Sequence, residues 1–270
     1  MNCVKQPLFR CKTDNAFQFK ILSELLSNIL NVGFFEISKT GISISMFDQP
    51  RKTMISIQLE AENFQTYVLN SKESLHIGMN TGHFHKMLKS LKKKDFIELS
   101  IESENLSELI IKTIPKEHNR VTVSGVKIQS AQNLDVAKPV GYTKSIIIQS
   151  SDFSKMIKDL SVVSSDVFTI SNTDDTIKFS ADSDGIVKRD VTFGGNGSDT
   201  SSSLYKTENK FAFAFEQLER ISKISSLSNS VYVYPCTTDL PLHIRSNIGS
   251  IGTLSIFIKS NEMLNNENNS

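Results

Sequence analysis

Residues 78–92 decide the fold and read GMNTGHFHKMLKSLK. The apolar side chains of this stretch recur at the i, i+3, i+4, i+7 spacing of one helical face. They are Phe84, Met87, Leu88 and Leu91. Lysines occupy the other side, at Lys86, Lys89 and Lys92 or Lys93. Asn80 or Thr81 is suited to cap the helix start, and the lysine run 92–94 suits the negative end of the helix dipole. We therefore predict an amphipathic helix with a basic outer stripe.

The composition is that of a globular protein. A length of 270 residues predicts one large domain or two of roughly 130 residues. With 39% hydrophobic and 22% charged residues, no tract reaches the ~18 apolar residues that span a membrane. Residues 1–20 lack the apolar core of a signal peptide, so we expect the protein to stay inside the cell. The net charge is only +1, so any contact with nucleic acid must use a local basic patch.

An internal repeat runs through the chain at an offset of about 133 positions. Residues 35–45 read strand, tight turn, strand, and residues 168–180 read the same. Helical segments repeat in step, 19–25 with 153–160 and 84–89 with 218–224. Their basic residues also repeat, Lys20 with Lys155, Lys86 with Arg220 and Lys89 with Lys223. Elements that recur at one offset predict two similar domains in tandem.

Short strands separated by turns fill the rest of each half. In the first half the predicted strands are 54–59, 64–69, 75–79, 96–101, 108–113 and 120–128. In the second half they are 145–149, 185–193, 210–215, 231–235, 241–246 and 252–258. Many short strands with two helices per half predict an α+β fold with antiparallel sheets.

The domain limits follow from breaks in periodicity. We expect an N-terminal domain over residues 1–128 and a C-terminal domain over 144–260. Pro and Gly interrupt any pattern in 129–143, which predicts a connecting linker. A mobile loop is expected at 196–203, and a disordered polar tail at 261–270.

Two such domains place basic helix stripes on one face of their sheets. If copies of the chain join through strand edges, the sheets form a closed outer wall and the helices line the inside. Lys and Arg facing a central hole contact phosphates of any sequence, so the contact is non-specific and sensitive to salt. A protein that slides along duplex DNA needs this kind of contact.

The chain resembles the eukaryotic, archaeal and viral sliding clamps of the proliferating cell nuclear antigen family. The motifs that carry the resemblance are 35–38 with Gly41, 78–89, 153–161, 177–181 and 239–242. The resemblance implies the DNA clamp fold, with sheets outside and two basic helices per domain inside. It also implies a head-to-tail homotrimer of six similar domains around duplex DNA. The channel positions it implies are Lys20, Lys86, Lys89, Arg120, Lys155, Lys158 and Lys223, and the internal repeat adds Arg220.

The resemblance further implies a hydrophobic groove beneath the linker, where partners dock a short helical motif with aromatic anchors. The groove residues it implies are Phe47, Arg51, Met54, Val136, Tyr142, Pro241, Leu242 and Phe257. For Met54 and Leu242, a place in the plain core is the other interpretation. Subunits are expected to pair strand 120–128 with strand 185–193 of the next copy, through Val121, Val123, Ile186 and Val191. The implied partners are duplex DNA, DNA polymerase and other motif-bearing proteins, a clamp loader and further copies of the chain.

No catalytic or metal site is predicted. A phosphate-binding Gly-x-x-x-x-Gly-Lys motif does not occur, and no Ser/His/Asp arrangement follows from spacing. His83 and His85 diverge at a helix start, so we expect solvent-exposed histidines and no metal pair. The three cysteines, Cys3, Cys11 and Cys236, form neither a Cys-x-x-Cys pair nor a disulfide framework. We interpret the chain as a non-catalytic processivity and docking factor without a cofactor, in the nucleus or at a viral replication site in the cytoplasm.

Two other functions stay open. A clamp-fold protein could work as a monomer or in a hetero-oligomer, as a polymerase accessory or checkpoint protein. A metal-dependent nuclease on a repeated α+β scaffold is the remoter alternative, because aspartates cluster at 174–175 and at 182–184, although Asp is also common at turns for its backbone geometry. The ending Lys259-Ser260-Asn261 departs from the family pattern, as does the near-neutral charge.

Overall fold

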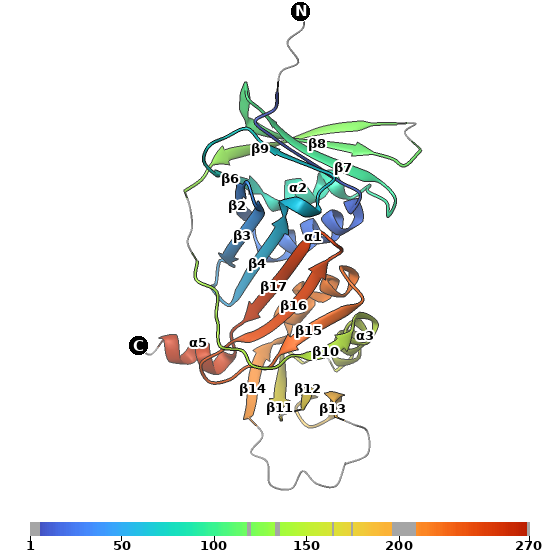
Figure 1. The fold of residues 1–270 in the computed structure, drawn as a ribbon. Helices are drawn as coiled ribbons and strands as arrows, with labels where there is room; N and C mark the ends of the chain where they lie inside the picture. The colour runs from blue at the N-terminus through green and yellow to red at the C-terminus, as the bar shows by residue number, and fades with distance from the viewer. Residues whose placement is uncertain are drawn as a thin grey trace, which may run out of the picture. The chain divides into compact units, whose positions relative to one another are not determined.

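The computed structural model describes residues 6–117, 120–132, 136–163, 165–173, 175–195 and 209–268 (Figure 1). The chain divides into two compact units. Unit 1 contains Met1–Gln49, Ile55–Ala137 and Asn247–Leu254, and unit 2 contains Pro50–Met54, Lys138–Ser246 and Ser255–Ser270.

Unit 1 is built on an antiparallel sheet whose strands lie in the order β4-β3-β2-β6-β9-β8-β7-β1-β5. The strands are β1 (Phe9–Thr13), β2 (Val32–Ser38), β3 (Gly41–Phe47), β4 (Thr53–Glu60), β5 (Thr66–Leu69), β6 (Leu75–Asn80), β7 (Phe96–Glu102), β8 (Asn105–Ile114) and β9 (Thr122–Ser130). Helices α1 (Ala16–Ile29) and α2 (Thr81–Leu88) belong to this unit, as does the 3-10 turn η1 (Ala61–Asn63).

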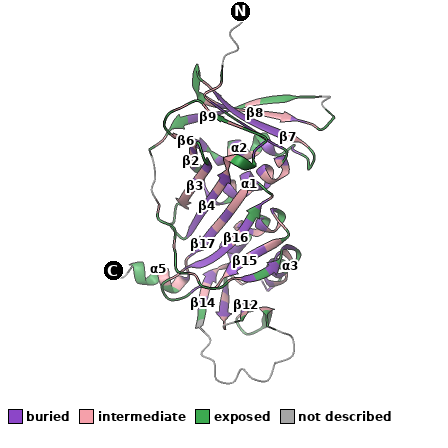
Figure 2. Ribbon diagram, in the orientation of Figure 1, coloured by how far each residue is buried: buried purple, intermediate pink, exposed green. Residues whose placement is uncertain are grey.

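The core of unit 1 follows from the two periodicities of the sequence. Along β2 every second residue is buried, including Phe35 and Ile37, because side chains of a strand alternate between its two faces (Figure 2). Helix α1 buries one apolar face that includes Phe19, Leu22 and Leu26. At the β2–β3 turn, Gly41 has φ +151, and a Cβ there would lie 1.9 Å from the Leu59 carbonyl oxygen, so this position requires glycine.

Unit 2 contains, in this order, β10, β15, the first part of β16 and the last part of β17, and it has a second sheet in the order β13-β12-β11-β14. The strands are β10 (Ile146–Gln149), β11 (Val167–Asn172), β12 (Thr176–Ser183), β13 (Val187–Gly194), β14 (Asn209–Ala214), β15 (Ser230–Tyr234), β16 (Leu242–Ile248) and β17 (Gly252–Ile258). Its helices are α3 (Ser150–Ser161), α4 (Phe215–Arg220) and α5 (Asn261–Asn268), with the 3-10 turn η2 at Ser222–Ser226. Phenylalanine rings fill the core of the second sheet, where Phe168 stacks on Phe213 with ring centroids 5.3 Å apart.

The predicted repeat is confirmed in the hairpins. β2 pairs with β3 so that Ile37 faces Ile42, and β11 pairs with β12 so that Ile170 faces Phe179, both antiparallel. Three of the four predicted helices form, as α1, α2 and α3, while the fourth divides into α4 and η2; the α+β class is confirmed. The predicted cap of α2 is also confirmed, because Asn80 Oδ1 accepts a hydrogen bond from the His83 N–H at 2.8 Å.

Other local predictions are wrong. Helix α3 begins at Ser150, three residues before the predicted segment 153–160. Strand 210–215 ends one residue early, because Phe215 already begins α4. The N-terminal strand β1 was not predicted at all.

The chain end and the domain limits differ from expectation as well. Within the predicted disordered tail, residues 261–268 form helix α5, where the Glu262 carboxylate accepts the Ala212 N–H of strand β14 at 3.2 Å and Lys259 pairs with Glu267 at 2.7 Å. The expected boundary at residue 128 lies inside β9, and unit 1 continues to Ala137. The loop predicted at 196–203 lies outside the described residues.

Candidate nucleic-acid interface and partner surfaces

In unit 1 the two helices that carry Lys20 and Lys86 are held against each other, and Lys89 directly follows α2. Ser23 Oγ of α1 lies 3.0 Å from His85 Nδ1 of α2. Lys20 Nζ donates to the Leu91 carbonyl at 3.4 Å, just beyond the end of α2. Lys86 and Lys89 are exposed, while Lys20 is half-buried. The structure therefore brings these three lysines together on the outside of one helix pair.

His85 differs from the prediction of two solvent-exposed histidines. His83 is exposed, but His85 is half-buried against α1. Burial lowers the pKa of His85, and the neighbouring Lys89 and Lys20 lower it too, while Glu24 acts in the opposite direction. His85 is thus neutral at pH 7 and adds no charge to the basic stripe.

In unit 2 the corresponding pair lies on α3. Lys155 and Lys158 are exposed, while the other face of the helix buries Phe153, Met156 and Leu160. Asp159 of the same helix forms an ion pair with Arg189 of β13 at 3.5 Å. The predicted lysine pair of α3 is therefore presented to solvent in the same way as that of α2.

The fourth predicted helix is broken. Helix α4 ends at Arg220 and the chain continues as η2, so Arg220 and Lys223 lie on different elements. The Arg220 guanidinium forms an ion pair with Glu216, four residues earlier in α4. This helix is therefore a weaker source of positive charge than α2. Arg120 is exposed and precedes β9, outside any helix.

The lysine run that follows α2 was not among the predicted DNA-binding residues. Lys92, Lys93 and Lys94 are all exposed, and Lys93 Nζ lies 5.6 Å from the centre of the Phe17 ring of α1. The run was visible in the sequence as a charged helix end. Only the tertiary structure shows that it adjoins α1, so that it extends the basic surface of unit 1.

Several of the predicted groove residues meet in an aromatic cluster of unit 2. The Tyr142 hydroxyl donates to the Pro241 carbonyl at 2.8 Å, and the Tyr142 ring lies 6.2 Å from that of Phe257. His243, which was not predicted, stacks against Phe257 at 4.3 Å and against Tyr234 at 4.5 Å. We call Tyr142, Tyr234, His243 and Phe257 the aromatic cluster.

His243 is held neutral inside this cluster. Burial, with a smaller contribution from Arg245, lowers the pKa of His243 to about 4. Its Nε2 lies 3.0 Å from Ser255 Oγ, while its Nδ1 is buried and has no partner among the described residues. The ring acts at neutral pH as an aromatic spacer between Tyr234 and Phe257.

The remaining groove residues divide into core and surface positions. Met54 is 1% exposed, Leu242 is 0% exposed and Phe257 is 4% exposed, so all three are buried in the core. Arg51 is exposed, with φ 55 in the left-handed region. Phe47 and Val136 are half-buried and belong to unit 1, whereas the others belong to unit 2.

The predicted interface strands both have an open edge within the described residues. Strand β9 pairs with β8 over Thr122 to Lys127, but with β6 only over Ile128 to Ser130. Strand β13 pairs with β12 and lies at the end of its sheet. Val121, Val123 and Ile186 are 46%, 64% and 84% exposed, while Val191 is half-buried.

Family models match both halves of the chain. "Proliferating cell nuclear antigen, N-terminal domain" matches residues 8–138, and "Proliferating cell nuclear antigen, C-terminal domain" matches residues 138–269. The chain belongs to the proliferating cell nuclear antigen family.

Members of this family with a curated description include two that are similar over most of their length. The DNA polymerase sliding clamp of Nitrosopumilus maritimus (strain SCM1) is 26% identical over 251 residues, which cover 93% of this chain and 97% of the relative. The probable DNA polymerase sliding clamp 1 of Paramecium bursaria Chlorella virus 1 is 24% identical over 259 residues, covering 93% and 96%. The crystal structure of proliferating cellular nuclear antigen from Entamoeba histolytica has a TM-score of 0.79 at 19% identity, over 94% of this chain and 99% of that one. This last likeness shows the fold alone.

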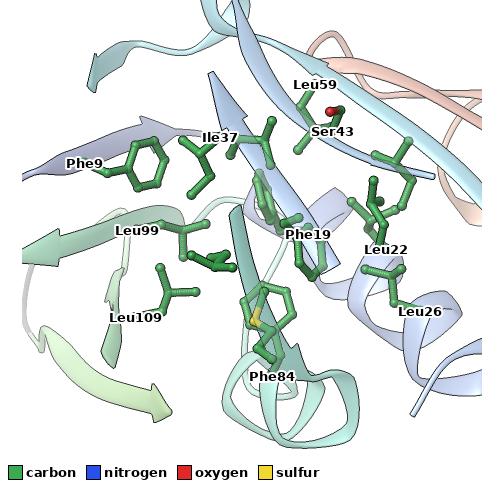
Figure 3. A pocket seen from close by; sticks show the side chains of 16 residues that line it. Phe9, Phe19, Leu22, Leu26, Ile37, Ser43, Leu59, Phe84, Leu99 and Leu109 are labelled. Atoms are coloured by element: carbon green, nitrogen blue, oxygen red, sulfur yellow. The ribbon is translucent and has the colours of Figure 1, made fainter. Parts of the chain in front are cut away.

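The cavity in unit 1 of this family member is part of the core. It has a volume of about 40 Å³ and lies between α1, α2 and the sheet, among Phe9, Phe19, Leu26 and Phe84 (Figure 3). Apart from Ser43 its lining is apolar, and such a cavity stays dry. Among the described residues no group of three or more His, Cys, Asp or Glu could hold a metal ion. None of the described helices has the length and apolar character to span a bilayer.

Proposed function

We propose that this chain is a DNA polymerase sliding clamp, a non-catalytic processivity factor that encircles duplex DNA and docks replication and repair proteins. The observation that carries the proposal is the matched pair of exposed lysines on α2 and α3, within two domains of this family. Lysines at these positions contact phosphates whatever the base sequence, which lets a protein move along DNA. The basic residues proposed to face DNA are Lys20, Lys86, Lys89, Arg120, Lys155, Lys158, Arg220 and Lys223.

A closed ring of three copies is part of the proposal. The open edge of β9 in one copy and that of β13 in the next supply unpaired N–H and C=O groups that can form one antiparallel ladder. The exposed side chains of Val121, Val123 and Ile186, with Val191, lose water when the strands pair. Head-to-tail pairing closes when the rotation fits, and closure removes both open edges.

The partner surface proposed for unit 2 centres on the aromatic cluster and includes Pro241, whose carbonyl accepts the Tyr142 hydroxyl, together with Arg51. A short helical motif can place an aromatic side chain against Tyr142, which is half-buried and whose ring lies beside the buried ring of Phe257. Phe47 and Val136 are proposed as groove residues from unit 1. The proposed partners are DNA polymerases, other motif-bearing proteins and a clamp loader, in the nucleus or at a viral replication site.

Charge reversal tests the proposal. The variant Lys86→Glu, Lys89→Glu, Lys155→Glu, Lys158→Glu should abolish stimulation of polymerase processivity on primed circular DNA. A control with the same charge change is Lys39→Glu, Lys72→Glu, Lys116→Glu, Lys138→Glu, all exposed and outside the proposed channel. If the first variant still stimulates as well as the control, the channel assignment is wrong.

Light scattering across a dilution series tests the ring separately. A mass near three times 30.2 kDa supports the trimer. A monomer throughout would favour a clamp-fold accessory protein that binds DNA without encircling it.

A further inference from the structure

The second sheet of unit 2 has a polar hollow on one face. It measures about 250 Å³ and is lined by Ser165, Val167, Thr169, Ser171, Lys178, Ser180, Asp182, Lys188 and Lys210. We call it the lysine hollow. Three lysines stand against one aspartate in its lining, and most of the other side chains carry hydroxyl groups.

Strand register places two of the lysines on either side of a serine. Ser171 of β11 faces Lys210 of β14 on one side and Lys178 of β12 on the other. Neighbouring strands lie ~4.8 Å apart, so the backbones at the two lysines are about 10 Å apart with Ser171 between them. Thr169 faces Ser180 in the next row of the same face, which adds two hydroxyls.

The acidic residues lie at the other end of the hollow. Asp182 faces Lys188 across the β12–β13 pair, and its Oδ1 accepts the Gly185 N–H at 2.7 Å. Lys188 also lies 3.5 Å from Asp190, so part of its charge is balanced within β13. We call the row of Lys210, Ser171 and Lys178 the positive end, because it holds two of the three lysines that line the hollow and not its aspartate.

The hollow lies on the face of this sheet opposite helix α3. Arg189 pairs with Asp159 of α3, and Lys188, the preceding residue of β13, lines the hollow. Successive residues of a strand point to opposite faces of the sheet. A duplex that lies along Lys155 and Lys158 of α3 is thus separated from the hollow by the sheet itself.

The chemistry of the positive end fits an oxyanion. A phosphate group carries close to two negative charges at pH 7 and three acceptor oxygens, which two ammonium groups and nearby hydroxyls can satisfy. Since one water takes up ~30 Å³ in the liquid, the hollow of about 250 Å³ has room for a phosphate group together with the side chain that carries it. These features favour a modified peptide over a bare ion.

We propose that the lysine hollow binds a phosphorylated segment of a partner protein, with the phosphate seated over Ser171 between Lys178 and Lys210. The proposal goes beyond the clamp function and does not depend on ring closure. It gives the chain a second docking surface, on another face from the DNA-facing helices of unit 2.

The test uses the full chain and a fluorescein-labelled peptide that carries one phosphoserine flanked by glutamates. Fluorescence anisotropy should detect binding of this peptide. The same peptide with unmodified serine should bind at least ~10-fold more weakly, because hydrogen bonds to a charged phosphate are stronger than those to a hydroxyl. The double variant Lys178→Gln, Lys210→Gln should bind the phosphopeptide about tenfold more weakly than the wild type does, and Lys210→Gln alone should weaken this binding by less. The matched control, Lys39→Gln with Lys72→Gln, should leave it unchanged. Inorganic phosphate at millimolar concentration should compete.

Three results would overturn the proposal. The first is equal affinity for the phosphorylated and plain peptides. The second is an equal loss of phosphopeptide affinity in the Lys178→Gln, Lys210→Gln variant and in the Lys39→Gln, Lys72→Gln control, when the thermal unfolding midpoints of both are unchanged. The third is a loss of affinity for duplex DNA in the Lys178→Gln, Lys210→Gln variant that is as large as its loss of affinity for the phosphopeptide. Such a result would mean that the hollow contacts DNA. If the hollow variant retains both its DNA binding and its stimulation of polymerase, the two surfaces act separately, as proposed.

Discussion

The salt dependence of DNA binding gives the sharpest measure of the lysines on α2. Lys86 and Lys89 are exposed, and neither has an ion pair within the described part of the chain. Arg220 instead pairs with Glu216. We predict that Lys86→Gln with Lys89→Gln reduces the salt dependence of DNA affinity more than Arg220→Gln with Lys223→Gln does. Glutamine keeps the helix propensity of lysine, so the change removes charge without unfolding α2.

The expected magnitude follows from counterion release. Each phosphate contact contributes ~0.9 to the slope of log affinity against log salt, so two lysines that face the duplex contribute ~1.8. Over a fourfold rise in salt, between roughly 50 and 200 mM, the wild-type affinity should then fall about tenfold more than that of the variant. Because Arg220 already has a carboxylate partner, the Arg220→Gln, Lys223→Gln variant should lose ~0.9 from Lys223 and less than that from Arg220, which together is less than the ~1.8 of the α2 variant.

The assay is a salt titration of the affinity for a short duplex, followed by fluorescence anisotropy. Circular dichroism and light scattering on the same variants establish that fold and mass are unchanged. An unchanged slope in the α2 variant would refute the assignment of Lys86 and Lys89. Equal changes in the two variants would refute the argument that the ion pair weakens Arg220.

Three further predictions follow from other parts of the molecule. Replacing Lys92, Lys93 and Lys94 with Gln should lower the slope of log affinity against log salt by ~0.9 for each of these lysines that reaches a phosphate. An unchanged slope would show that the three lysines lie away from DNA. Phe153→Ala should lower the free energy of unfolding by about 3–5 kcal/mol, because Phe153 is fully buried beneath α3, and a loss below about 1 kcal/mol in denaturant titration would contradict that packing. The low pKa of His243, about 4 against an ordinary 6.5, means that the unfolded chain takes up a proton between these values before the folded chain does. Stability should therefore fall as pH drops through that window, and less steeply in His243→Phe; identical pH profiles would show that His243 does not titrate in this way.

Much of the fold could be predicted because burial has a local period. Phe84, Leu88 and Leu91 recur at helical spacing, and all three are buried in the structure. Alternation in 35–45 and 168–180 predicted two hairpins, which form with the expected antiparallel pairing. The offset between the two halves predicted two domains of one kind, and family models match both. The exposed lysines of α2 and α3 were predicted from the same periodicity, since a residue opposite the buried face of a helix must face solvent.

What only the tertiary structure decided concerns partners far apart in sequence. His85 and Ser23 are 62 positions apart, and nothing near His85 predicted that α1 would half-bury it. His243 is a polar residue in a strand, yet rings from three other segments make it part of an aromatic cluster. The lysine hollow needs the register of β11, β12 and β14, which is fixed by buried phenylalanines on the opposite face. A sequence determines which face of an element is buried, because that depends on the period of its own side chains. It does not determine what that face or the opposite one meets, because those contacts depend on how distant elements pack.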